Sequence, residues 1–246
     1  MSDHYLPEKL PLLTSGAAGL GVDITEEMEK QFVLFGDRLL EKNKVMNLTA
    51  VTDPEEVQTK HFLDSLAIVA VTDLSERDLK VIDVGTGAGF PGIPLKIVYP
   101  QLKITLMDSL KKRLNFLNEV IDELRYENTE TLHGRAEDIG HQKEYRGQYD
   151  LCVSRAVANL SSLCEYTLPL VREGGMVVAY KSVNAGEEVK EAEKAVRVLG
   201  GEIKEVKEFV LPGTDLFRSL VVIEKKKATP SRYPRKAGTP AKDPIH

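Results

Sequence analysis

The stretch Val81-Ile82-Asp83-Val84-Gly85-Thr86-Gly87-Ala88-Gly89-Phe90-Pro91-Gly92 carries the signals that decide the fold of this chain. The apolar run before the first glycine predicts a buried parallel strand. The four glycines within eight residues predict a tight turn that lets backbone approach a ligand, and Pro91 suits the first turn of a helix. A strand, a glycine loop and a helix N-terminus that meet at one point are typical of a nucleotide-like cofactor site in a doubly wound fold.

Two cofactor classes fit this loop. The spacing of Gly87, Gly89 and Gly92 matches the Gly-x-Gly-x-x-Gly pattern of dinucleotide sites, and an acid, Asp108, follows about 20 residues later. The stretch 83–89 equally matches the Asp-x-Gly-x-Gly-x-Gly signature of S-adenosylmethionine-dependent methyltransferases. The loop alone therefore leaves open an NAD(P)-dependent oxidoreductase and a methyltransferase.

Hydrophobic periodicity divides the chain into three predicted parts. Residues 1–74 form a helical extension, residues 75–224 alternate between strands and helices, and residues 225–246 form a basic, proline-rich tail. In the extension, apolar residues at helical spacing predict a helix over Glu26–Asn43, and Asp53-Pro54-Glu55-Glu56 begins a second that runs to about Val71. In the middle part we expect strands at 79–84, 103–107, 129–133, 149–153 and 176–180, and helices at 91–98, 110–124, 156–171 and 187–199.

The last two predicted strands break the alternation. Residues 202–211 and 218–225 are joined by Pro212-Gly213-Thr214-Asp215 with no room for a helix, so we expect an antiparallel hairpin. This ending favours a class I S-adenosylmethionine-dependent methyltransferase fold over an NAD domain. That fold is α/β and Rossmann-like, with a mostly parallel seven-stranded sheet and a C-terminal antiparallel hairpin.

Composition and charge narrow the function classes. The hydrophobic fraction of 42% and charged fraction of 29% are typical of a globular protein; the sequence predicts neither a membrane span nor a signal peptide. Cys152 and Cys164 lack metal-ligand spacing, so we expect buried thiols in a reducing cytoplasm, and no metal. The net charge is −5, yet residues 225–246 contain seven basic residues and one acid. Such a tail indicates either a local polyanion contact or a frayed, solubilising terminus.

The candidate site follows from the rule that open α/β sheets bind ligands at the carboxyl ends of their strands. The loop amides after the first strand suit a carboxylate, and Asp83 suits an ammonium group, with a helix-cap or loop acid as the alternative. Asp108 ends the second strand, where it can accept two ribose hydroxyls or cap the next helix. Ala136-Glu137-Asp138 follows the third strand and can contact an adenine edge or begin a helix.

Two cations and one helical pair complete the candidate residues. Arg155 and Lys181 follow the fourth and fifth strands, so we expect them to face one cleft and position a substrate, with solvated loop charges as the alternative. His61 and Asp64 lie three apart on one helix face; they can fix the entrance of the cleft, but we expect a local surface pair.

The absence of two catalytic motifs limits which atom can accept the methyl group. The fourth strand is followed neither by an Asn/Asp-Pro-Pro-aromatic stretch nor by a Pro-Cys loop that would supply a covalent nucleophile. An acceptor that needs neither a general base nor a covalent adduct fits best, and guanine N7 is one. Its methylation requires in-line positioning, and Arg and Lys are natural partners of guanine O6 and phosphate.

Five segments resemble ribosomal RNA small subunit methyltransferase G, a family also called glucose-inhibited division protein B. The Gly-Phe-Pro-Gly loop and the closing Tyr-Pro-Arg-Lys-x-Gly-x-Pro are the specific ones. The segments are 43–52, 60–65, 85–92, Ser154-Arg155-Ala156 and 233–240. The resemblance implies methylation of N7 of one guanosine in the decoding region of 16S ribosomal RNA, with S-adenosylmethionine as cofactor.

The resemblance also implies roles for individual residues. It implies cofactor contacts at Gly85, Phe90, Asp108, Ser109, Leu110, Ala136, Glu137 and Arg155, beside the loop residues Asp83, Gly87 and Gly89. It implies RNA contacts at Arg135 and Lys181, and the tail would add Arg232, Arg235 and Lys236 as phosphate contacts. We then expect removal of the tail to weaken RNA binding and leave cofactor binding nearly unchanged. The expected partner is 16S ribosomal RNA or the small ribosomal subunit, and the expected state is a cytoplasmic monomer.

Overall fold

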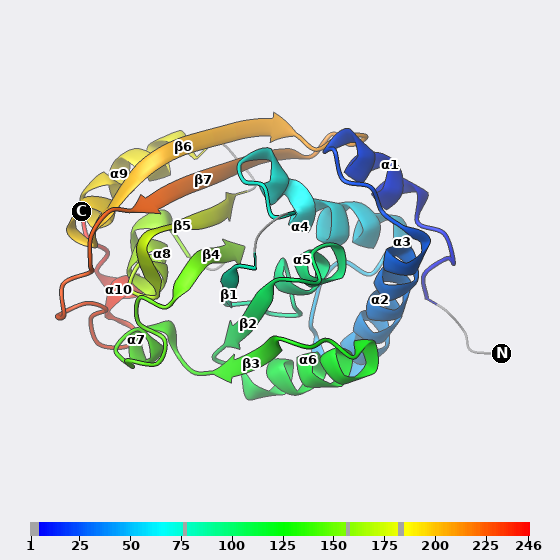
Figure 1. Ribbon diagram of the computed structural model, residues 1–246, viewed down its shortest axis with the longest axis horizontal. Coiled ribbons are helices and arrows are strands. Elements are labelled where there is room, and N and C mark those ends of the chain that lie inside the picture. Colours follow the sequence, from blue (N-terminus) through cyan, green and yellow to red (C-terminus); the bar gives the residue numbers. More distant parts are fainter. Residues whose placement is uncertain (1–4, 76–77, 156–157, 182–184) are drawn as a thin grey trace.

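The computed structural model describes residues 5–75, 78–155, 158–181 and 185–246, and a seven-stranded sheet forms the centre of this part (Figure 1). The strand order is β3-β2-β1-β4-β5-β7-β6. The first five strands are parallel, and β7 runs antiparallel to both β5 and β6. The strands are β1 (Lys80–Val84), β2 (Lys103–Asp108), β3 (Thr129–His133), β4 (Tyr149–Arg155), β5 (Val171–Lys181), β6 (Gly201–Val210) and β7 (Phe217–Lys225). The predicted doubly wound sheet with an antiparallel end is confirmed.

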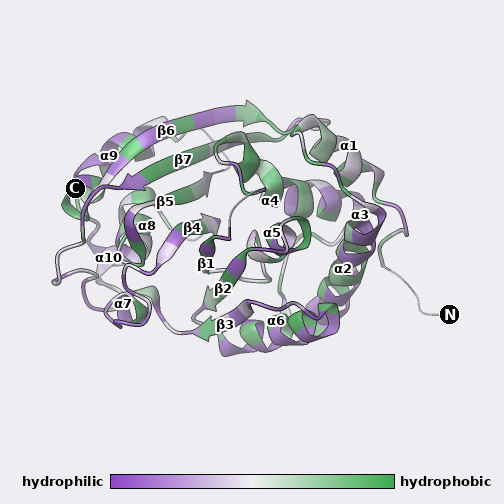
Figure 2. Ribbon diagram, viewed as in Figure 1, coloured by the Kyte–Doolittle hydropathy of each residue, from purple (hydrophilic) through white to green (hydrophobic). Residues whose placement is uncertain are grey.

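Helices cover both faces of the sheet because successive strand residues point to opposite sides. Val81 of β1 packs into one apolar cluster with α2, α5 and α6, and its neighbour Ile82 packs into a second cluster with α8 and α9. In Figure 2 the edge strand β6 mixes hydrophilic and hydrophobic residues, whereas the inner strand β7 is mostly hydrophobic. The longer helices are α1 (Pro11–Gly19), α2 (Glu26–Met46), α5 (Gly92–Val98), α6 (Lys111–Leu124), α8 (Leu160–Thr167) and α9 (Gly186–Val198). No helix among the described residues is long and apolar enough to cross a membrane.

One predicted helix is too long at both ends. The expected helix over 156–171 is observed only as α8, and residues 156–157 lie outside the described part of the chain. Val171 already belongs to β5, where it pairs with Tyr149, and the Gly174-Gly175 pair lies inside this strand. A short apolar run such as 168–171 fits a strand and a helix equally, which is why periodicity misassigned it.

The helical segment 53–71 is less regular than predicted. Asp53 caps it as expected, because its Oδ1 accepts hydrogen bonds from the amides of Glu55 and Glu56. The chain then passes through α3 (Pro54–Glu56), a π-helical segment η1 (Val57–Leu63), α4 (Asp64–Leu66) and η2 (Ala67–Ala70). The wider π turn changes which residues share a face. Asp64 is 5% exposed, so the expected surface pair with His61 is wrong.

The basic tail is folded onto the body of the protein. Its first residue, Lys225, is the last of β7 and is buried. The Lys225 ammonium donates to the carbonyls of Leu168 and Leu199, and burial lowers its pKa to about 7. The remainder packs against the end of α7 (Ala136–Ile139), and its short helix α10 (Thr239–Lys242) lies beside α8 (Figure 1). This packing contradicts the alternative of a frayed terminus.

Candidate active site

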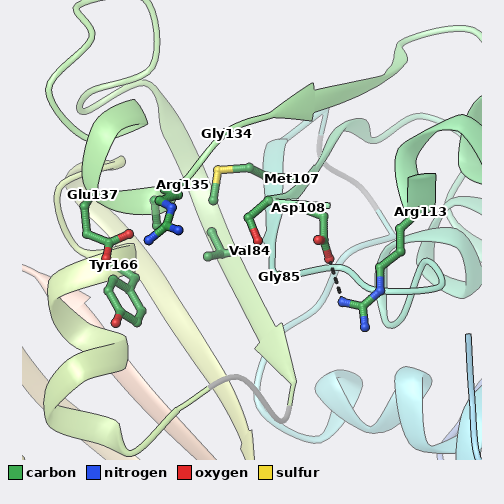
Figure 3. Close-up of a pocket in the computed structure, with 11 residues that line it drawn as sticks. Val84, Gly85, Met107, Asp108, Arg113, Gly134, Arg135, Glu137 and Tyr166 are labelled. Atoms are coloured by element: carbon green, nitrogen blue, oxygen red, sulfur yellow. Dashed lines mark hydrogen bonds and ion pairs between the residues drawn. The ribbon is translucent and has the colours of Figure 1, made fainter. Parts of the chain in front are cut away.

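A pocket of about 440 Å³ opens at the carboxyl ends of β1 and β2 (Figure 3). The expected residues Gly85, Asp108, Ser109, Ala136 and Glu137 line it. Arg135, expected to face RNA, lines it as well. Sequence reasoning missed Val84, Met107, Arg113, Gly134 and Tyr166. The strand-end rule could have identified Val84 and Met107, but Tyr166 comes from α8 through tertiary packing alone.

The glycine loop reaches this pocket through Gly85, and Gly87 and Gly89 lie outside the residues that line it. Gly85, Gly87 and Gly89 have φ values of 73°, 61° and 99°, which L side chains rarely adopt. A Cβ on Gly87 would meet only the Gly85 carbonyl oxygen, at 4.0 Å, whereas a Cβ on Gly89 would lie 2.7 Å from Ile93. Gly87 is therefore needed for its backbone angle, and Gly89 also for close packing against α5.

Asp108 links the end of β2 to this loop. Its Oδ1 accepts from the Leu110 amide at 2.8 Å. Its Oδ2 accepts from the Gly87 amide at 3.0 Å. The same oxygen accepts from Arg113 at 3.3 Å (Figure 3). A carboxylate has about four acceptor positions, so Asp108 retains capacity for a ligand hydroxyl on the side that lines the pocket.

Asp83 lies behind the loop and is fully buried. Its Oδ2 accepts from the Thr86 hydroxyl at 2.7 Å and the Gly92 amide at 2.9 Å. Its Oδ1 is, among the described residues, the one buried side-chain oxygen or nitrogen without a partner. Burial is the main cause that raises the pKa of Asp83 to about 6. An unpartnered acceptor at this depth fits a cationic ligand group.

The raised pKa of Asp83 predicts a specific pH dependence of stability. The unfolded carboxyl titrates near pH 4, so the folded protein holds this proton more tightly and the stabilisation is lost as pH rises through 6. In Asp83→Asn, one amide oxygen can still accept from Thr86 and Gly92. Between pH 4 and 6.5 the wild type loses the stability that the Asp83 proton provides, and Asp83→Asn has no such proton to lose. We therefore expect the decrease in the free energy of unfolding over this range to be about 2 kcal/mol smaller for Asp83→Asn than for the wild type. Urea unfolding at several pH values measures this, and parallel curves for the two proteins would contradict it.

A second pocket of about 310 Å³ lies at the carboxyl ends of β4 and β5. Arg155 and Lys181, the two expected substrate-positioning cations, both line it. The other lining residues are Lys60, His61, Asp64, Tyr180 and Arg218. The structure thus brings the two cations to one cleft, as the strand-end rule predicts.

Asp64 organises the cations of this second pocket. Its Oδ2 accepts from Arg155 at 2.9 Å, and its Oδ1 accepts from Arg218 at 2.5 Å. The three side chains are 6%, 15% and 14% exposed. Arg155 also donates to the Lys60 carbonyl at 3.1 Å. One carboxylate therefore fixes two guanidinium groups from β4 and β7.

The ring of Phe90 packs against the Arg155 guanidinium. Phe90, expected to contact the cofactor, is buried and lies with its ring centre 5.0 Å from the Arg155 guanidinium. His61 stacks on the same ring, with centroids 4.4 Å apart. Burial and the Arg155 charge lower the pKa of His61 to about 3. His61 is therefore neutral at pH 7 and a weak base, and its Nε2 is engaged by the Thr49 hydroxyl at 2.7 Å.

Lys181 is fixed in a similar way. Its ammonium donates to Glu188 of α9 at 2.8 Å and to the Ala158 carbonyl at 2.9 Å. The Lys181 side chain is 14% exposed. Two acceptors therefore hold the ammonium in place, which suits a positioning cation.

The expected tail contacts divide into two groups. Arg232 and Lys236 are exposed, whereas Arg235 forms an ion pair with buried Glu165 at 2.8 Å and another with Asp243 at 3.3 Å. The guanidinium expected to meet phosphate thus has two protein carboxylates as partners. In the described part of the chain, no group of three or more His, Cys, Asp or Glu side chains could hold a metal ion, and both cysteines are buried and free.

Comparison with known proteins gives consistent matches. The family model "rRNA small subunit methyltransferase G" matches residues 28–217. The "Ribosomal RNA small subunit methyltransferase G" of Acetivibrio thermocellus is 49% identical over 95% of this chain and 96% of its own length. The protein of the same name from Alkaliphilus metalliredigens is 50% identical over 97% and 99%.

Solved structures with low sequence identity share the fold. A complex of the Haloferax volcanii Trm112 methyltransferase activator with a methyltransferase matches with a TM-score of 0.55 and 14% identity, over 70% of this chain and 92% of that chain. The fibrillarin pre-rRNA processing protein of Methanococcus jannaschii matches with a TM-score of 0.50 and 16% identity, over 65% and 74%. These matches agree with the class I methyltransferase fold predicted from the hairpin ending.

Proposed function

We infer, because this chain belongs to the rRNA small subunit methyltransferase G family, that it methylates small-subunit ribosomal RNA with S-adenosylmethionine as cofactor. The residues present fit that cofactor. The unpartnered Oδ1 of Asp83 suits its ammonium group, the left-handed glycine loop admits close approach, and Asp108 retains acceptor capacity for a hydroxyl. When bound, the cofactor supplies an electrophilic methyl group.

We propose guanine N7, at one position in the decoding region of 16S ribosomal RNA, as the methyl acceptor. The observation that carries this proposal is the second pocket, where the fixed cations Arg155, Lys181 and Arg218 gather and no described lining side chain is suited to remove a proton. Among the described residues that line this pocket, the one imidazole is that of neutral His61, whose pKa is lowered, and the Asp64 carboxylate is held by Arg155 and Arg218. N7 carries a lone pair and no proton, so positioning alone suffices.

In this mechanism the residues of the chain bind and orient. Arg155 and Lys181 suit guanine O6 and phosphate oxygens, which accept hydrogen bonds from such cations. His61 and Phe90 support Arg155 and keep it in one orientation. The exposed cations Arg135, Arg232 and Lys236 remain proposed contacts to the RNA backbone. We further propose that the protein acts as a monomer in the cytoplasm.

A chemical test of the acceptor uses small-subunit ribosomal RNA methylated by the purified protein. Borohydride and aniline cleave RNA at 7-methylguanosine, so we expect cleavage at a single guanosine in the decoding region. A matched RNA fragment with 7-deazaguanine at that position should accept no methyl group. Methylation of the deaza fragment would contradict N7, and cleavage outside the decoding region would contradict the proposed position.

Lys181→Ala should separate turnover from cofactor binding. Lys181 lines the second pocket and not the first, so we expect kcat to fall about tenfold or more, while the affinity for S-adenosylmethionine changes less than about twofold. Steady-state kinetics with ribosomal RNA and calorimetric titration of the cofactor measure the two quantities. An equal loss in both would show that Lys181 acts on the cofactor pocket.

A further inference from the structure

We propose that residues 226–246 form a C-terminal clasp that positions Glu137 in the cofactor pocket and thereby sets the affinity for S-adenosylmethionine. The inference rests on the proposed function, because it assumes that this pocket holds that cofactor. It assigns the segment a role at the cofactor that is separate from any contact with RNA.

The direct contact is a hydrogen bond between the clasp and a residue that lines the pocket. The Gly238 amide donates to Glu137 Oε1 at 2.9 Å. Glu137 lies in the first turn of α7 and is 8% exposed. A hydrogen bond to a buried carboxylate fixes its orientation, so the clasp determines which acceptor positions Glu137 presents to a ligand.

The clasp also holds the far end of α7. Pro234 packs so closely on Gly140 that a Cβ at residue 140 would lie 2.7 Å from the proline ring. His141 contacts the Pro234 carbonyl at 2.7 Å. Arg146 donates to the carbonyls of Tyr233 and Thr229 at 2.9 and 2.7 Å. Contacts with the clasp therefore lie at both ends of this helix.

A buried ion pair anchors the clasp itself. Glu165 of α8, whose side chain is 1% exposed, accepts from the Arg235 amide at 2.6 Å and from its guanidinium at 2.8 Å. Arg235 also donates to the Asp243 carbonyl at 2.7 Å. Removing one partner of such a pair leaves a buried charge unpaired. The ion pair therefore stabilises the clasp in its packed position on α8.

The short length of α7 makes the position of Glu137 depend on the clasp. The helix has four residues, too few to be stable without tertiary contacts. The position of Glu137 must therefore be set by what packs on α7, and the clasp supplies contacts at both ends. The proposal therefore predicts that removing the tail weakens cofactor binding, whereas the sequence alone predicts that cofactor binding stays nearly unchanged.

The test uses two glycines with matched backbone geometry. Gly238 has φ +83° and Gly213, in the β6–β7 turn, has φ +73°, and a Cβ on either meets nothing within 4 Å. Gly238→Ala and Gly213→Ala thus add similar local strain. We expect Gly238→Ala to weaken binding of S-adenosylhomocysteine about fivefold, the effect of disturbing one hydrogen bond to a charged group, and Gly213→Ala to leave it unchanged. Gly238→Asn should restore most of the affinity, because asparagine tolerates the left-handed region.

A double-mutant cycle separates positioning of Glu137 from general loss of structure. In a Glu137→Ala background, Gly238→Ala should cause no further loss of affinity, because the group through which it acts is absent. Additive losses would overturn the proposal, as would unchanged binding by Gly238→Ala in the wild-type background. If Gly238→Ala does not fold, Arg235→Lys, which keeps the charge but loses the fork on Glu165, is expected to show the same non-additivity. Failure of the wild-type protein to bind S-adenosylhomocysteine would instead refute the proposed function.

Discussion

Gly87→Val should abolish binding of S-adenosylmethionine while the protein stays folded. Gly87 has φ +61°, a conformation that is a severe outlier for a β-branched residue. Its amide donates to Asp108 at 3.0 Å, so a backbone shift that relieves the strain also breaks the link between the glycine loop and the end of β2. We expect the affinity to fall by at least about 100-fold, since both the loop and Asp108 change position. Calorimetric titration with the cofactor measures the loss.

Gly213→Val is the matched control for this prediction. Gly213 also has a left-handed φ and open space around it, but it lies in the β6–β7 turn away from the pocket. Gly213→Val should therefore lower the free energy of unfolding by an amount similar to Gly87→Val and leave cofactor binding intact. If Gly87→Val bound the cofactor with wild-type affinity, the glycine loop could not be the binding element.

Much of the sheet could be predicted because its signals are local. The apolar residues of β1 and the turn residues that follow lie within one stretch, so the position of the glycine loop follows from the sequence. The edge of the sheet that carries the site also follows, because the carboxyl ends of parallel strands meet there. This rule placed Asp108, Glu137, Arg155 and Lys181 at one edge without knowledge of any long-range contact. Their division between two pockets, with Arg155 outside the pocket that Asp108 lines, is visible only in the structure.

The tail and the helical extension could not be predicted in the same way, because their signals are partners far away in the sequence. Arg235 is a free cation by sequence, yet its carboxylate partner, Glu165, lies 70 residues earlier. Asp64 is an ordinary helix residue by sequence, yet the π turn before it directs the carboxylate to arginines on two strands. Local patterns identify which residues are charged, and only tertiary packing decides which charges face one another.

The glycine loop connects the two pockets. Phe90 belongs to the end of the glycine loop and supports Arg155 of the second pocket. Asp83 lies beneath the same loop, and the positive charge of Arg155 is among the influences that lower its pKa, against the larger effect of burial. A change in the glycine loop should therefore alter the position of Arg155 in the second pocket.

Asp64→Ala should cause the largest loss of both stability and turnover among single replacements in the second pocket. It removes the one carboxylate that pairs with Arg155 and Arg218, whose side chains are only 15% and 14% exposed. Breaking a buried pair by removing one partner costs about 3 to 5 kcal/mol, because a charge is left uncompensated. We expect the free energy of unfolding to fall by about 3 kcal/mol and kcat to fall by more than about 100-fold, because Arg155 loses its orientation.

Glu41→Ala is the matched control for that loss. Glu41 also pairs with an arginine, Arg38, but both side chains are about half exposed, and exposed pairs contribute about 0 to 1 kcal/mol. Its stability and turnover should stay near those of the wild type. Asp64→Asn distinguishes charge from shape, because the amide keeps an acceptor for one arginine but not the charge that both require. Urea unfolding and methyl transfer to ribosomal RNA measure the two effects; wild-type turnover in a folded Asp64→Asn protein would show that Arg155 is oriented without the Asp64 charge and would remove Asp64 from the positioning of substrate.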